Sequence, residues 1–420
     1  LLLLFLWEGF WAISRVARQI GYGNIIHLAV TIFGLILIIW RSLSRPYCVP
    51  VGMNQPWFAF KRIMFVFMLW AICSSILQTN YTVANTVFAL IWIANAIAII
   101  WCVPRLLQFA SIGDRLGILR LLTEVLVYSS LVCLPFSSFK QGRFCGFAGN
   151  ATIPGRLFAY SIVFSFAYML FCRRQKRFIL LFVVSIIALL LNRTRASMFG
   201  VAVAMVTMLF GPYIKTQVSR IWRNHIRMAK LSFVFFVVMS LGLFLFSGET
   251  VQNRVLGHFR LSKGYAHTLE TSRLMNWQAG LKELRSGSLL GKGFMSKYGG
   301  SEERIVFGLA FPLYDWNTDA DPLNSLCTMT KQLGYVGGFL HLCILCYLLK
   351  SLTHVNNLAI HRFLLGLWGI GMIWGFLDGN WLTSFGDPID RLSLVTFALL
   401  ICSPQTHQGH TGETNRSHVA

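Results

Sequence analysis

The chain has 420 residues, of which 55% are hydrophobic and only 12% are charged. No water-soluble domain needs so much apolar surface, so the composition excludes a soluble globular protein and indicates many membrane-spanning segments. The 37 Lys and Arg residues against 15 Asp and Glu give a formal net charge of +22, which in a soluble protein would suggest a nucleic-acid partner. Here the cations cluster at the ends of apolar segments, as the positive-inside rule describes, so we predict no nucleic-acid partner.

Apolar segments follow one another along most of the chain. The first, residues 1–13, is too short to span a bilayer and contains Glu8, so we interpret it as a truncated first helix rather than a signal peptide. Further spans are predicted at 25–40, 62–77, 83–103, 118–136, 157–172, 178–191, 196–212, 230–247, 335–350, 363–377 and 391–402. The predicted fold is therefore an all-α polytopic membrane protein with about 11–12 transmembrane helices.

Residues 248–334 form the one long segment that is too polar for a bilayer, and we predict that they make a large helical loop outside the cytoplasm. An amphipathic helix is expected over 271–286, because apolar residues recur there at spacings of three and four. A second short helix is expected from Asp321, its N-cap, to Gly334, where the chain returns to the membrane. The predicted organisation is an N-terminal bundle over 1–247, the loop, C-terminal helices over 335–402 and a tail over 403–420.

The short loops predict the orientation of the chain. The basic clusters at 173–177 and 215–230 contain almost no acids, so they and the tail are predicted to be cytoplasmic. Counting spans from these clusters then places the segment 140–156, the turn 192–195 and the loop 248–334 outside. Arginines around positions 143, 193, 195 and 273 therefore face one compartment, although the rule disfavours cations there. Each could be a snorkelling anchor, but together they suit an amphiphilic substrate carrying a phosphate or pyrophosphate, because guanidinium groups fork onto phosphate oxygens.

Four groups of short motifs occur in order between residues 143 and 337. They are Arg143-Phe144-Cys145-Gly146-Phe147 with Asn150; Thr194-Arg195-Ala196-Ser197, with Arg193 as the alternative alignment; Ser272-Arg273 with Trp277 and Leu289-Leu290-Gly291-Lys292-Gly293-Phe294; and Asn324 with Gly334-Tyr335-Val336-Gly337. In this order and on this topology, they resemble the superfamily of O-antigen ligases and O-antigen polymerases of the bacterial envelope.

The resemblance implies a glycosyltransferase of the bacterial inner membrane with a periplasmic active face. Its donor would be an oligosaccharide linked to undecaprenyl pyrophosphate, and it would use neither a cofactor nor a metal. Its further partners would be membrane lipids, a flippase and a chain-length regulator. The residues that it assigns to the pyrophosphate are Arg195, Arg273, Arg193 and Arg143, and those that it assigns to other parts of the substrate are Asn324 and Trp277.

The residues before Asn324 distinguish two activities within this superfamily. Ligases usually carry His immediately before the Asn, where this chain has Leu323, whereas polymerases often have acidic residues, and here Asp319 and Asp321 are present. We therefore predict a polymerase of O-antigen or exopolysaccharide in which one of these carboxylates is the catalytic base, with a ligase as the alternative. Asp321 could instead be only the helix cap.

Other interpretations of these residues have less support. The pattern Asp319-Ala320-Asp321 also matches a metal-binding motif of nucleotide-sugar enzymes, but nucleotide sugars are cytoplasmic, so no metal is predicted. A flippase or secondary transporter would place cations along an internal cavity or show repeated halves. Glu124 follows Arg120 by four residues inside a span, which predicts an ion pair, with a buried functional acid as the alternative.

Overall fold

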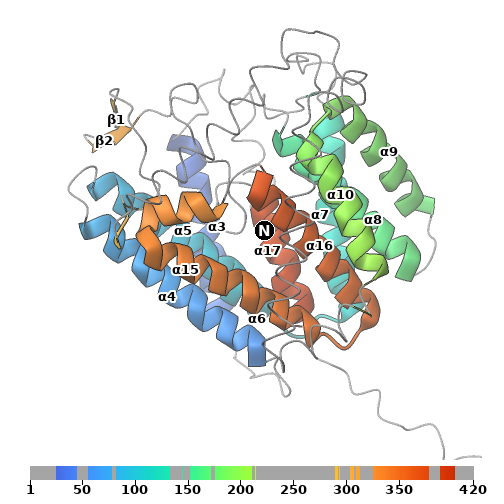
Figure 1. Cartoon of the computed structure of the whole chain (residues 1–420), viewed down its shortest axis with the longest axis horizontal. Helices are drawn as coiled ribbons and strands as arrows, with labels where there is room; N and C mark the ends of the chain where they lie inside the picture. Colours follow the sequence, from blue (N-terminus) through green and yellow to red (C-terminus); the bar gives the residue numbers. More distant parts are fainter. Residues whose placement is uncertain are drawn as a thin grey trace, which may run out of the picture.

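The computed structural model describes residues 25–44, 55–77, 82–132, 144, 152–171, 176–210, 213, 289–291, 293, 303–306, 309–312, 325–377 and 388–402. The helices are α3 (Ile25–Leu43), α4 (Gln55–Leu77), α5 (Thr82–Ile97), the π-helical turn η1 (Ala98–Cys102), α6 (Val103–Leu106), α7 (Ile112–Val132), α8 (Thr152–Phe171), α9 (Lys176–Asn192), α10 (Arg195–Leu209), α15 (Ser325–Thr353), α16 (Leu358–Leu377) and α17 (Pro388–Ile401). They pack as one bundle (Figure 1), and an antiparallel hairpin of β1 (Glu303–Val306) and β2 (Leu309–Pro312) accompanies them.

Four stretches of helix are long and apolar enough to cross a membrane. Among the described residues they are Pro56–Leu77, Ala89–Leu106, Thr328–Thr353 and Leu358–Leu377. At 1.5 Å per residue, α16 is about 30 Å long, which matches the hydrocarbon core of a bilayer. The protein is therefore a helical membrane protein, while the full number of spans stays a prediction, since segments such as 1–13 and 230–247 lie outside the described residues.

Contacts between neighbouring helices show which helix ends lie together. The Phe164 ring of α8 lies 6.2 Å from Phe178 of α9 and 5.5 Å from Phe363 of α16, centroid to centroid. Because Phe164 comes late in α8 whereas Phe178 and Phe363 come early in their helices, α8 runs antiparallel to both. In the α10 and α16 pair, a Cβ atom on Gly200 would lie 2.7 Å from Ile370, so these backbones approach as closely as small residues allow in a membrane.

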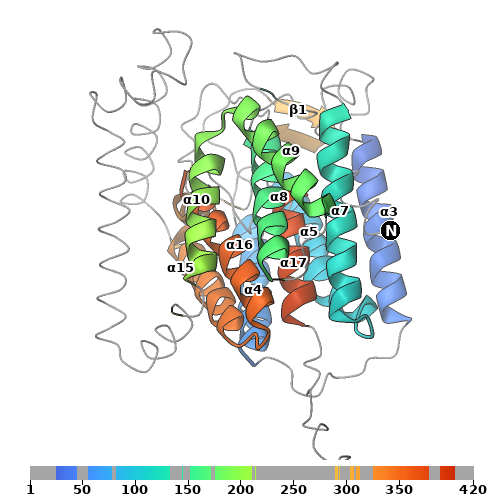
Figure 2. The same cartoon turned by 90° about the vertical axis from the view of Figure 1, so that its right-hand side faces the viewer.

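The helix ends thus form two sets, which we name after one residue of each. The Arg195 end holds the starts of α8 and α10 with the ends of α9 and α16, and the Lys176 end holds the start of α9, the end of α10 and the turn between α15 and α16. Figure 2 shows the connection from α9 to α10 at the top and the turn from α15 to α16 at the bottom. Arg195 and Lys176 thus lie at opposite ends of the bundle, while the sides of the membrane that these ends face stay a prediction.

Arg115 ties three segments together at the Lys176 end. The side chain is fully buried, and its guanidinium donates hydrogen bonds to the carbonyls of Ala110 (3.1 Å), Leu107 (2.8 Å) and Leu399 (2.7 Å). These carbonyls belong to the approach to α7, the chain after α6 and the last turn of α17. Carbonyls at a helix C-terminus lack partners within the helix, so the cation both completes their hydrogen bonding and opposes the negative end of the dipole.

The start of α7 is capped by its own side chains. The Ser111 hydroxyl accepts a hydrogen bond from the Asp114 backbone N–H at 3.1 Å, while the Asp114 carboxylate accepts from the Ser111 backbone N–H at 3.1 Å, a capping box, and also from the Ser111 hydroxyl at 2.7 Å. These bonds from Ser111 hold the pKa of the exposed Asp114 carboxyl below its ordinary value. Further along the helix, Arg120 Nε lies 3.9 Å from Glu124 Oε1, which confirms the predicted ion pair.

The helix α15 is two helices joined by a sharp bend. Gly334 has φ 72° and ψ −174°, so the predicted helix stop at this residue is confirmed. The part before the bend folds back along the part after it, with Ser325 Oγ 3.3 Å from His341 Nε2, and no sequence pattern predicts this fold-back. Figure 1 shows the shorter and the longer part of α15 meeting at one edge of the bundle. We call Ser325–Leu333 the short arm and Tyr335–Thr353 the long arm.

Candidate functional site

The turn between α9 and α10 carries the two predicted pyrophosphate ligands that lie among the described residues. Arg193 adopts a left-handed backbone conformation with φ 56°, and Thr194 is the extended N-cap of α10. Arg195 is then the first residue of α10, and its side chain is exposed. A cation in this place is not stabilised by the helix dipole, whose N-terminal end is positive. The turn is therefore suited to an anion that would offset the charge of both arginines and of the helix end.

Phe144 anchors this turn. Its backbone N–H donates to the Leu191 carbonyl at 3.1 Å, and its carbonyl accepts from the Asn192 side-chain amide at 2.5 Å. The ring is fully buried and stacks on Phe158 of α8, with centroids 6.0 Å apart. Asn192 also accepts a hydrogen bond from the Thr194 hydroxyl. The motif that begins at residue 143 and the arginine turn, far apart in sequence, are thus joined through backbone and amide hydrogen bonds.

A second contact joins the other two groups of motifs. The backbone N–H of Gly293 donates to the Gln332 carbonyl at 2.8 Å, and Gly291, with φ 72°, lies so close to Gln332 and Gly334 that a side chain there would overlap their backbones. Two residues of α4 complete the contact. The Trp70 indole N–H donates to the Leu333 carbonyl at 2.8 Å, and the Ser74 hydroxyl donates to the Leu290 carbonyl at 2.6 Å.

Both contacts lie at the Arg195 end of the bundle, because the long arm of α15 runs from Gly334 to the turn at the Lys176 end. The structure therefore brings the Arg193 and Arg195 turn beside Phe144, and the run from Leu289 to Gly293 beside Gly334. The other predicted site residues lie outside the described residues, so their roles stay predictions: Arg143, Arg273, Trp277, Asp319, Asp321 and Asn324.

Buried charges at the start of α17 form a feature that the sequence reasoning missed. The Tyr160 hydroxyl of α8 lies 2.6 Å from the Thr396 hydroxyl of α17. Arg156 comes one helical turn before Tyr160, and Leu392 comes one turn before Thr396, so Arg156 and Leu392 lie at the same level of the bundle. Asp390 and Arg391 stand at this level, and all three charged side chains are buried. The Arg156 guanidinium also lies 5.8 Å from the centre of the Trp374 ring. Their only sequence signal is an acid and a base next to each other at the start of an apolar run.

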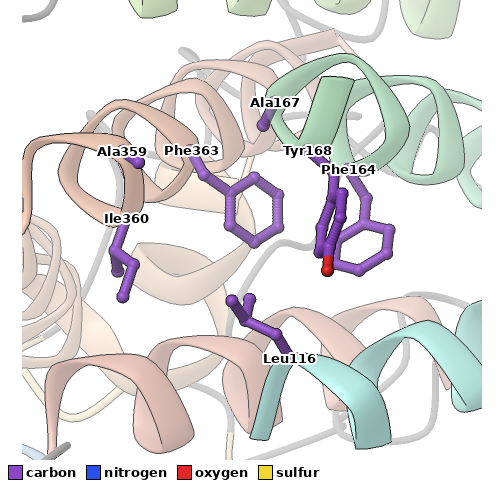
Figure 3. A pocket seen from close by; sticks show the side chains of 7 residues that line it. All are labelled: Leu116, Phe164, Ala167, Tyr168, Ala359, Ile360 and Phe363. Carbon is purple, nitrogen blue, oxygen red and sulfur yellow. The ribbon is translucent and has the colours of Figure 1, made fainter. Parts of the chain in front are cut away.

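A small apolar pocket opens at the opposite end of the bundle. It is lined by Leu116, Phe164, Ala167, Tyr168, Ala359, Ile360 and Phe363, from α7, α8 and α16 (Figure 3). Its lining contains no charged group, and the starts of α7 and α16 place it at the Lys176 end. Such a pocket can hold an apolar group but not a phosphate, so it does not belong to the arginine site.

No protein-family model matches the chain, and a search of the curated proteins finds no match either. The fold and the site thus define a class and not a family: a helical membrane protein in which Phe144 meets the distant turn of Arg193 and Arg195 at one end of the bundle.

Proposed function

We propose that this protein is a membrane glycosyltransferase that polymerises oligosaccharide repeat units linked to undecaprenyl pyrophosphate, on the outer face of a bacterial inner membrane. The products would be O-antigen or exopolysaccharide chains. The observation that carries this proposal is the pair of hydrogen bonds that Phe144 makes with Leu191 and Asn192. These bonds hold the residue after Arg143 against the turn of Arg193 and Arg195. Arginines from distant segments would then serve one anionic ligand.

The chemistry requires charge stabilisation at this place. The acceptor hydroxyl oxygen bonds to the anomeric carbon of the donor sugar, and the bond from that carbon to the pyrophosphate breaks, so the pyrophosphate leaves with the electron pair. Exposed Arg195, together with Arg193, would stabilise the developing negative charge through forked hydrogen bonds. A base must accept the proton of the acceptor, and Asp319 and Asp321 are the candidates that the sequence suggests.

The outer face of α9 suits the lipid part of the donor. Apolar side chains are exposed along this helix up to the arginine turn: Ile179, Leu180, Val183, Ile187, Leu190 and Leu191. In a membrane such a face contacts hydrocarbon, so a polyprenyl chain can lie along it while its pyrophosphate reaches the arginines. The amphiphilic character of the proposed donor thus matches the neighbouring apolar and basic surfaces.

The proposal is tested by replacing Arg195 with Lys. Lysine keeps the charge but not the fork, so R195K should lose most long-chain glycan, by about tenfold or more, while still inserting at the normal level. R177K, at the other end of α9, is the matched control and should keep normal chains. Normal glycan ladders from both R195K and R273K would show that these arginines are only interfacial anchors.

A deletion strain separates polymerase from ligase. Loss of a polymerase should leave single repeat units attached to their final carrier, with long chains absent. If long chains instead accumulate on the lipid carrier and none is transferred, the protein is a ligase. D321N tests the carboxylate in the same assay, because Asn caps a helix about as well as Asp but cannot accept the proton.

A further inference from the structure

The short arm of α15 begins inside the bundle, beside a buried histidine. Ser325 is only 7% exposed and His341 is fully buried. The contact between Ser325 Oγ and His341 Nε2 places the start of the short arm about 10 Å along the long arm from the bend, at 1.5 Å per residue. Thr330 lies beside Gly338 in the same way, so the two arms are in contact along their length. The short arm therefore begins at the level of His341.

His341 is a buried ring with one nitrogen unaccounted for. Among the residues that the structure describes, Nδ1 has no hydrogen-bond partner. Buried polar atoms in proteins nearly always have a partner, and a role in chemistry is one reason for an exception. His361 on α16 is equally buried, but its Nδ1 faces a backbone carbonyl, that of Leu352 at 2.8 Å, whereas His341 Nε2 faces a hydroxyl, which can give up a proton.

We propose that Ser325 and His341 form the proton relay of the glycosyl transfer, an inference that rests on the proposed function. A neutral imidazole with its hydrogen on Nδ1 presents Nε2 as an acceptor to the Ser325 hydroxyl. As the acceptor oxygen bonds to the anomeric carbon and the pyrophosphate leaves with its electron pair, the acceptor proton passes to Ser325 Oγ. The proton of Ser325 passes at the same time to His341 Nε2. Transfer of that proton to water then restores the neutral ring.

In this relay His341, and not Asp319 or Asp321, is the base that takes up the proton. Leu323 has no group that can accept a proton. Ser325 follows two residues later, and the fold of α15 brings an imidazole to it from a position 16 residues further along the chain. In nucleophilic sites a histidine beside a serine hydroxyl takes up the proton of that hydroxyl, and the same transfer occurs in this relay.

The test uses conservative variants of the full-length protein, purified in detergent and assayed with a lipid-pyrophosphate-linked repeat unit. H341Q keeps a side-chain hydrogen bond to Ser325 but cannot take up a proton, so transfer should fall by about 100-fold or more. The transfer rate of S325A should fall to a similar extent. The rate of the double variant should be no lower than that of either single variant, because the effects of residues that act as one unit do not add. H361Q, a buried histidine at the other end, should stay within a few-fold of the wild type.

The outcomes are separable. An H341Q protein that inserts, melts like the wild type and transfers glycan at the normal rate overturns the relay, as does a fully active S325A. If H341Q fails to insert, S325A decides, since it removes one hydroxyl group. Losses that multiply in the double variant also contradict the relay. A wild-type protein that inserts but transfers no glycan overturns the proposed function itself, whereas an active wild type with active variants overturns only the relay.

Discussion

Asn192 is the residue on which the geometry of the arginine turn depends most directly. Its amide N–H donates to the Phe144 carbonyl at 2.5 Å inside the protein. N192D keeps the shape of the side chain but replaces the donor with an acceptor, which sets two acceptors against each other. We expect the free energy of unfolding to fall by about 1–3 kcal/mol and the glycan chains to shorten. Thermal unfolding of the detergent-solubilised protein and the glycan ladder measure the two effects.

Asn357 provides the matched control for this substitution. Its side-chain oxygen accepts from the backbone N–H groups of Ala359 and Ile360, where it caps α16 at the Lys176 end. Asp accepts equally well in such a cap, so N357D should melt like the wild type and make chains of normal length. Equal effects of N192D and N357D would contradict the role that we assign to the Phe144 contact.

Arg115 makes a second prediction at the scale of a residue. Lysine at this position has the charge but cannot reach carbonyls on three segments at once, so R115K leaves buried carbonyls without donors. We expect a loss of about 2 kcal/mol or more in the free energy of unfolding. Because Arg115 lies at the end opposite the arginine turn, glycan transfer per folded molecule should not change. An R115K protein as stable as the wild type would mean that these bonds contribute little.

At the scale of an element, the bend of α15 depends on glycine. A side chain at Gly334 would have to adopt φ 72°, and its Cβ atom would overlap the Leu289 carbonyl. G334A should therefore separate the short arm from its contact with the loop and greatly reduce the yield of folded protein. Gly117 of α7 is the control, since a Cβ there meets nothing within 4 Å, and G117A should be neutral or slightly stabilising. Normal yield and melting temperature of G334A would show that the bend can form without glycine.

Hydropathy predicts which segments are helical but not how they bend. Each predicted span among the described residues falls on a helix, because an apolar run must satisfy its own backbone hydrogen bonds in a membrane. The ends differ, however: α4 begins at Gln55 rather than at residue 62, and the predicted span 83–103 continues through η1 and Pro104 to Leu106. The fold-back of α15 could not be predicted, since Gly334 indicates only that a helix stops. His341 was missed for the same reason, because its partner lies across the bend.

At the scale of the whole molecule, the two sets of helix ends predict the topology. A phosphatase reporter, which is active outside the cytoplasm, should be active when fused after Arg193 and at residue 280. A fluorescent reporter, which is active inside, should be active when fused at residue 220 and after Asn356, because the basic clusters favour the cytoplasm. Both reporters are tested at all four positions. Fusions at 280 and 220 that report the same side would contradict the predicted orientation.

The candidate site could be predicted in outline from the whole-molecule pattern. Charge counting alone placed the segments of Arg143 and Arg195 on one side, and the structure brings Phe144 into contact with the turn that ends at Arg195. The register that places Arg156 near Asp390 and Arg391 could not be found in this way, since it depends on how α8 and α17 pack. Sequence patterns predict which side of the membrane a residue faces. Which residues become its neighbours depends on the packing between distant helices.

The hydrogen bond from Arg115 to Leu399 joins residues that are 284 positions apart, and this separation has a consequence for biogenesis. During synthesis α7 enters the membrane long before α17 has left the ribosome. For this time the Arg115 guanidinium lacks the hydrogen bond to the Leu399 carbonyl. Until α17 arrives, the nascent bundle carries an incompletely compensated buried cation, which quality-control proteases can recognise. The arrival of α17 would therefore remove this signal: molecules that stop before Pro388 should be degraded quickly, although all the motif residues are already made.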